Sequence, residues 1–127
     1  MIVHELTALG GSLDMRHFDR DFALTNRLRT EGTDHLLAAG RAVGVRRFVA
    51  QSFAGWTTAR TGGRVKTEED PLDSAPPDAM RETLAAVKHL EQAVIGAQWT
   101  EGVVLRYGSL YGPGTALAPD ASVSRRR

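Results

Sequence analysis

The stretch VRRFVAQSFAGW, Val45 to Trp56, decides the expected fold. Its apolar centre, Phe48 to Ala50, follows Gly44 and two arginines and is followed at once by small and polar residues. A short apolar run bounded in this way is typical of a parallel strand that is covered on both faces. We therefore expect a strand over Arg47 to Gln51, with chemistry outside its carboxyl end, where α/β proteins place their ligands.

Helical and extended patterns alternate on either side of this strand. Apolar residues recur at helical spacing before and after it, and Asp78 stands where it can cap the second helix. A long surface loop between this strand and the second helix is indicated by Gly-Gly, a charged TEED run and three prolines. The expected elements are strand Ile2 to His4, helix Phe22 to Val43, strand Arg47 to Gln51, loop Thr57 to Pro77, helix Ala79 to Gly96 and strand Val103 to Arg106. This order predicts an α/β fold, β-α-β-α-β, with a parallel sheet.

Composition excludes several classes of protein. The 127 residues suffice for one domain, and 42% hydrophobic with 24% charged residues are ordinary for a globular protein. A net charge of +1 provides no field suited to nucleic acid or an anionic membrane surface. The absence of cysteine excludes disulfides and thiolate metal sites, and we expect no metal. No apolar run approaches a membrane span and no secretory signal precedes the first strand, so we expect a cytoplasmic protein.

Three pieces of the sequence, in order, resemble one family. GTDHLLAAGRAVGVRRFVAQS (Gly32 to Ser52), Ile2-Val3-His4 and LRYGSLYGPG (Leu105 to Gly114) are similar to motifs of extended short-chain dehydrogenases/reductases, the NAD-dependent epimerase/dehydratase family. The resemblance implies the second half of a Rossmann domain over residues 1–114, without the first three strands or the Gly-rich dinucleotide fingerprint. Residues 115–127 are expected to be a disordered or truncated tail.

The resemblance also implies cofactor positions. Leu6 and Thr7 correspond to backbone that passes the nicotinamide ribose. Tyr107 and Gly108 lie along the nicotinamide, and Ser109 faces the substrate. NAD or NADP is therefore the implied cofactor. We expect this chain alone to bind it weakly, because the pyrophosphate contacts belong to the part of the family fold that we do not find here.

The implied catalytic groups match less well. Ser52 is the candidate for the hydroxyl that polarises the substrate and borders the cofactor, although the alignment that fits Phe48 puts Phe53 at that position. The family's tyrosine and lysine positions fall on Thr83 and Val87, or in a shifted register on Met80 and Leu84. Lys88, one residue from Val87, points to another helix face and is expected at the surface. The family's bracing asparagine is replaced by Arg29, which we expect to face solvent, with Asn26 as a possible substitute.

Two functions remain open at this point. The resemblance implies an NAD(P)-dependent oxidoreductase or epimerase/dehydratase that transfers hydride to or from a sugar-like or other small hydroxyl or carbonyl substrate. The alternative is a catalytically inactive fragment or interaction module that retains the Rossmann scaffold. In either case the unpaired edge at Ile2 to His4 predicts self-association, such as a homodimer.

Overall fold

The computed structural model describes residues 1–8, 14–110 and 112 of the chain. Its elements, in chain order, are β1 (Ile2–His4), the 3₁₀ turn η1 (Met15–His17), α1 (Phe18–Asp21), α2 (Ala23–Arg27), the π-helical turn η2 (Leu28–Gly32), α3 (Thr33–Ala42), β2 (Arg47–Phe53), the 3₁₀ turn η3 (Asp78–Met80), α4 (Arg81–Ile95) and β3 (Glu101–Tyr107). The expected domain boundary at Gly114 and the tail 115–127 lie outside the described residues.

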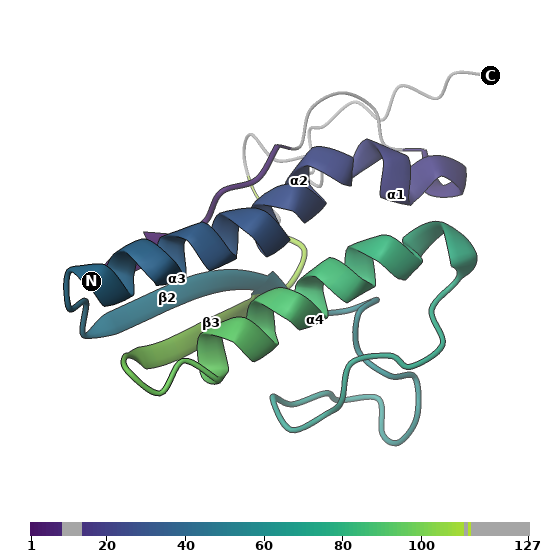
Figure 1. Ribbon diagram of the computed structural model, residues 1–127. Helices are drawn as coiled ribbons and strands as arrows, with labels where there is room; N and C mark the ends of the chain where they lie inside the picture. The colour runs from purple at the N-terminus through teal and green to yellow at the C-terminus, as the bar shows by residue number, and fades with distance from the viewer. Residues whose placement is uncertain (9–13, 111, 113–127) are drawn as a thin grey trace.

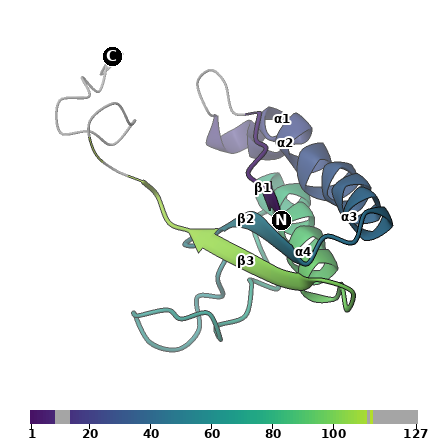
Figure 2. The ribbon, with the colours of Figure 1, turned by 90° about the vertical axis from the view of Figure 1, so that its left-hand side faces the viewer.

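The three strands form one parallel sheet in the order β1-β2-β3. The two connections between them carry the helices, and Figure 2 shows α1 to α4 together on one side of the sheet. This arrangement confirms the predicted α/β fold, a partial Rossmann-like sheet. Figure 1 shows that α1, α2 and α3 follow one another as a long rod beside α4.

The core lies between the sheet and α4. Phe48 and Ala50 point from β2 toward the helices and are fully buried, and they pack with Leu90 and Val94 of α4. Alternation along β2 explains this, because every second residue points to the same face of a strand. The apolar stripe predicted for this helix is therefore core.

The opposite face of the sheet has no helix in the described part of the chain. Val3 of β1 is 53% exposed and Leu105 of β3 is 36% exposed, while Val49 is partly covered. The outer edge of β1 also has no partner strand among the described residues. Self-association through this surface stays a prediction.

The first predicted helix differs from the observed one in two ways. It begins earlier, at Phe18, and it is interrupted at Phe22 and again at η2. In η2 the Thr33 N–H reaches back to the Leu28 carbonyl, which also contacts His4 Nε2 at 3.2 Å. A side chain that binds a helix carbonyl from outside is a recognised cause of such distortion.

The predicted cap at Asp78 is wrong. Asp78 makes no capping hydrogen bond and instead pairs with Arg81. The first turn of α4 is capped by Asp19, whose carboxylate accepts the N–H groups of Glu82 at 2.9 Å and Thr83 at 2.8 Å. An anion at a helix N-terminus is favourable wherever in the sequence it comes from.

None of the described helices is long and apolar enough to cross a membrane.

Gly102 sets the distance between α4 and β3. A Cβ at this position would lie 2.1 Å from the Val94 carbonyl oxygen, which is a backbone atom and cannot rotate away. We expect Gly102→Ala to lower the free energy of unfolding by about 3 kcal/mol or more, because α4 must move off the sheet. Urea denaturation measures this.

Gly63→Ala is the control, since its nearest described neighbour would be 3.9 Å away in the exposed loop. A Gly102→Ala variant as stable as Gly63→Ala would contradict the close approach.

Candidate functional site

The carboxyl ends of the three strands lie at one edge of the sheet, and one hydrogen bond spans it. The Tyr107 hydroxyl, at the end of β3, donates to Glu5 Oε1, just after β1, at 3.2 Å. The Ala54 N–H, after β2, donates to the Tyr107 carbonyl at 2.8 Å. The bond to Glu5 raises the pKa of Tyr107, so the phenol stays protonated at neutral pH. All three strand ends are therefore held together.

Five of the predicted site residues gather at this edge. Leu6 and Thr7 directly follow Glu5, and Gly108 and Ser109 directly follow Tyr107; these four are exposed. The roles of these residues toward cofactor and substrate stay predictions.

Ser52 lies on the other face of the sheet. β2 continues to Phe53, so Ser52 is inside the strand, and it points toward the helices with 1% of its surface exposed. Its hydroxyl donates to Glu91 Oε1 at 2.5 Å. Tyr107 pairs with Phe53 in the register and therefore faces away from Ser52. The catalytic role of Ser52 stays a prediction, but the structure separates its hydroxyl from the Tyr107 side of the edge.

Glu91 and Arg106 form the best-enclosed ion pair among the described residues. Arg106 donates from Nε at 2.9 Å and from Nη2 at 2.7 Å, and the two side chains are only 12% (Glu91) and 23% (Arg106) exposed. The hydrogen bond with Glu91 raises the pKa of Arg106. A fork-shaped contact with two bonds is the strongest geometry for this pair.

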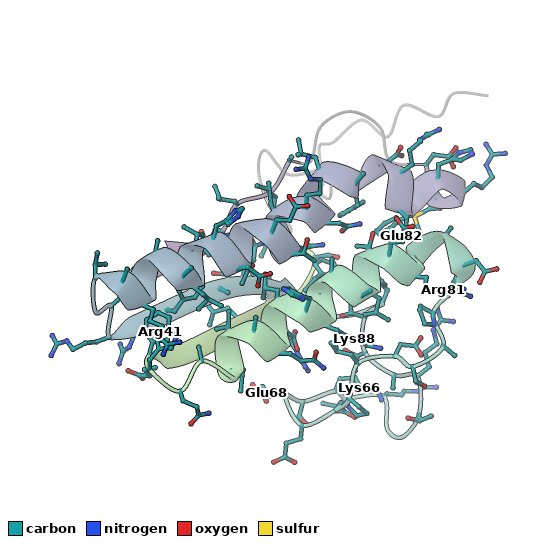
Figure 3. All side chains as sticks on the ribbon, in the orientation of Figure 1. Arg41, Lys66, Glu68, Arg81, Glu82 and Lys88 are labelled. Atoms are coloured by element: carbon teal, nitrogen blue, oxygen red, sulfur yellow. The ribbon has the colours of Figure 1, made fainter. Side chains whose placement is uncertain are left out.

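The same arginine holds the surface loop. Arg106 Nη1 donates to the carbonyl of Asp70 at 3.2 Å, and Lys88 Nζ donates to that of Asp73 at 2.6 Å. Figure 3 shows Lys88 on α4 above the loop that carries Lys66 and Glu68. Lys88, predicted at the surface, is instead half buried because its ammonium group binds the loop. The loop Thr57 to Pro77 is therefore tied to α4 and β3 at several points.

A second polar network surrounds Thr83, the residue to which the resemblance assigns the family's tyrosine position. Thr83 is fully buried; its hydroxyl donates to Asp19 Oδ1 at 2.6 Å and accepts from Asn26 Nδ2 at 3.0 Å. The Asp19 carboxylate cannot donate, so the Thr83 hydroxyl must donate to it and can only accept from Asn26. These two hydrogen bonds fix the orientation of the Asn26 amide. Asn26 Oδ1 is enclosed and has no partner. Val87, to which the resemblance assigns the lysine position, is 1% exposed, so neither Thr83 nor Val87 presents an acid or a base.

The prediction that Arg29 faces solvent is wrong. Arg29 is only 7% exposed, and its guanidinium lies 6.0 Å from the ring centre of Phe22. It lies one helical turn from the buried Thr25 and Thr33, whose hydroxyls contact Ala8 and His4, so packing against the end of β1 buries it.

His4, at the end of β1, is buried as a neutral imidazole. Its Nε2 lies 3.2 Å from both the Leu28 carbonyl and the Thr33 hydroxyl, and its Nδ1 accepts the Leu6 N–H at 3.4 Å. The Leu28 carbonyl can only accept a hydrogen bond and the Leu6 N–H can only donate one, so His4 carries its proton on Nε2. Burial first, and the charge of Arg29 second, lower the pKa of His4 below 6.5 against the opposing effect of the Leu28 bond.

Aromatic rings cluster beside these groups. Phe18 and Phe22 stack with ring centres 4.2 Å apart, Trp56 meets Phe18 edge-on at 5.3 Å, and Phe53 lies 6.1 Å from Trp56. The cluster joins the loop after β2 to the start of the helical rod.

The sequence prediction missed Asp19 as a helix cap, the burial of Arg29 and the pair of Glu91 with Arg106. Asp19 and Arg29 carry no sequence signal, because both act across elements that are far apart in the chain. Glu91 carried a signal, since it is polar on an apolar helix stripe. Among the described residues, no three metal-ligating side chains gather.

The chain is 46% identical over 127 residues, 99% of its length, to a protein of Streptomyces sp named 3-diazoavenalumate denitrifying reductase. It spans 40% of that relative's length. No protein-family model matches the sequence, and no solved structure matches it significantly. The chain thus has a curated homologue that is named a reductase.

The Glu91 pair is expected to contribute much more stability than an exposed pair of the same kind. Glu91→Ala leaves Arg106 and Ser52 without their acceptor, and we expect a loss of about 2–3 kcal/mol in urea denaturation. Limited proteolysis should then cut the loop Thr57 to Pro77 faster, because Arg106 no longer has a fixed position.

Glu101→Ala is the matched control. Glu101 makes a similar two-bond contact with Arg47, but both side chains are more than half exposed, so removal should cost about 1 kcal/mol or less. Equal losses in the two variants would contradict the structural role of Glu91.

Stability should fall in mild acid because of His4. Its folded-state pKa lies below 6.5, so as the pH falls through 6.5 the unfolded chain takes up a proton that the folded chain refuses. The stability contributed by His4 is fully present above pH 6.5. It is lost progressively as the pH falls from 6.5 to the folded-state pKa. Melting temperatures from pH 7.5 to 5 should therefore decline, and His4→Gln should make the decline shallower. His35→Gln, in an exposed position on α3, should leave the slope unchanged.

Proposed function

We propose that this chain forms the nicotinamide and substrate side of an NAD(P)-dependent oxidoreductase. The observation that carries the proposal is the meeting of Leu6, Thr7, Tyr107 and Gly108 at one carboxyl edge, held by the bond from Tyr107 to Glu5. Ligands of parallel α/β sheets bind at this edge. The homologue named a reductase supports the same class of reaction.

The residues at the edge are suited to a flat ring. A Cβ added at Gly108 would meet no described atom within 4 Å, so the end of β3 has room for a ligand against the backbone. The nicotinamide supplies a hydride when it is bound. In this proposal the protein provides the backbone at Leu6 and Thr7 on one side, Gly108 on the other, and Ser109 toward the substrate.

The buried position of Thr83 favours a reaction that needs no tyrosine acid. Reduction of a carbonyl leaves an alkoxide that takes a proton from such an acid. When hydride displaces a diazonium group, the C–H bond forms, the C–N bond breaks with its electron pair going to nitrogen, and dinitrogen leaves without a proton. The name of the homologue includes both a diazo compound and a denitrifying reduction. We therefore propose that the substrate is a small molecule that bears a diazo group, in preference to a sugar-like carbonyl compound.

A second candidate is the catalytically inactive interaction module. It is favoured by the same observation, because Thr83 and Val87 are both buried where the family has its acid and its lysine. The open sheet face at Val3 and Leu105 would be its contact surface, and self-association its simplest use.

Nuclear magnetic resonance on the 127-residue chain separates the two candidates. We expect millimolar binding, because immobilising a flexible dinucleotide costs about 4 kcal/mol or more and few fixed polar contacts are present here. At concentrations of about 10 mM, NADH, NADPH or nicotinamide mononucleotide should shift the amide signals of Leu6, Thr7 and Gly108, with weak affinity. At sub-millimolar concentration neither the melting temperature nor tryptophan fluorescence should change.

Adenosine diphosphate ribose, which lacks the nicotinamide, is the control ligand and should not shift these signals. No shift with any nicotinamide compound would favour the interaction module. Saturable micromolar binding would contradict the expected weakness and reveal a phosphate site elsewhere in the chain.

A further inference from the structure

Arg29 is a buried cation without an anion. It is 7% exposed, and it takes part in none of the ion pairs or side-chain hydrogen bonds of the described residues. Its pKa is lowered by burial, with no carboxylate acting against this. The ring of Phe22 at 6.0 Å is the group that its guanidinium faces. An unpaired buried charge is costly, so proteins rarely keep one without a use.

The guanidinium is not completely enclosed. The side-chain atoms that are fully enclosed and unpaired in the described chain are Asn26 Oδ1 and Thr100 Oγ1, and no nitrogen of Arg29 is among them. The neighbouring His4 does not compete for an anion, because burial keeps its imidazole neutral. The space beside Arg29 thus holds one positive charge, a neutral imidazole and an aromatic ring.

We propose that Arg29 binds an oxyanion of a ligand, a carboxylate or a phosphate group, beside Phe22. The planar fork of a guanidinium matches the two oxygens of such a group. The stacked rings of Phe22 and Phe18 are only 8% and 5% exposed, so they enclose one side of the guanidinium, and the rest of the ligand would extend outward from the oxyanion. The proposal goes beyond the reductase activity, because it concerns anion binding alone.

A ligand-binding arginine and a structural one respond differently to removal. A structural arginine would leave partners unsatisfied, so its loss would destabilise the fold. Arg29 has no such partner, so Arg29→Met removes a buried charge and keeps the apolar stem. The free chain should melt at the same or a higher temperature, as is common when a functional group is replaced by an apolar one.

The first test measures melting temperatures of the full 127-residue chain in benzoate, in inorganic phosphate and in chloride, all at equal ionic strength. At about 20 mM, an oxyanion that binds with millimolar affinity should raise the melting temperature of the wild type by about 3 °C or more over chloride. Arg29→Met should show no rise.

Arg27→Met is the matched control, because Arg27 is exposed on the same rod and pairs with Glu31, and its response should equal that of the wild type.

A second measurement needs no variant. The Nε–H resonance of Arg29 should shift and saturate with the oxyanion that stabilises the chain, and Arg29→Lys should raise the dissociation constant at least tenfold because the fork is lost. A response to benzoate alone supports a substrate carboxylate, a response to phosphate alone supports a nucleotide phosphate, and a response to both supports a general oxyanion site.

The proposal is overturned if neither anion acts beyond chloride, or if Arg29→Met responds as the wild type does. If Arg29→Met fails to fold in chloride, the Nε–H titration decides: saturation supports the site, and an unchanged resonance overturns it.

Discussion

The approach of α4 to the sheet is the constraint on which the other features depend. At Gly102 the backbone of β3 and the Val94 carbonyl of α4 come so close that no side chain fits between them. This contact brings Glu91 within reach of Ser52 and Arg106 and places Thr83 beside Asn26 and Asp19. A wider spacing would leave these buried polar groups unpaired, which costs more than their bonds contribute. The glycine is thus the reason that a polar network can exist under the helix.

The alternation of strand residues divides the carboxyl edge into two different environments. On the helix side, Ser52 and Arg106 serve an enclosed ion pair that anchors the long loop. On the open side, Tyr107 and Glu5 meet near the surface. A shift of one residue in β2 would exchange these two environments, since the side-chain period of a strand is two. The register with β3, fixed from Arg47 to Phe53, therefore decides which hydroxyl can meet a ligand.

Patterns within short segments predicted the fold well. The apolar run at Phe48, the glycines that end helices and the proline-rich loop gave the order of elements and the parallel sheet. The end of β2 was placed two residues too early, because a buried strand with Ser52 pointing into a polar network looks like a strand that has already ended. Arg29 was misplaced for a related reason: an arginine with no partner carries no sequence signal of burial. The predictions that failed concern contacts between distant segments, which the periodicity of the sequence does not report.

The cap that Asp19 places on α4 links the start of one helix to the docking of another. Asp19 lies 63 residues before Glu82 in the chain, and no local side chain replaces it at this helix end. The first turn of α4 can therefore be completed only after α1 has docked, so helix initiation and tertiary assembly become one cooperative event. Isolated helices of this length are marginal in water, which strengthens the coupling. Hydrogen exchange at the Glu82 and Thr83 amides would consequently report the opening of the α1 contact rather than fraying of α4 itself.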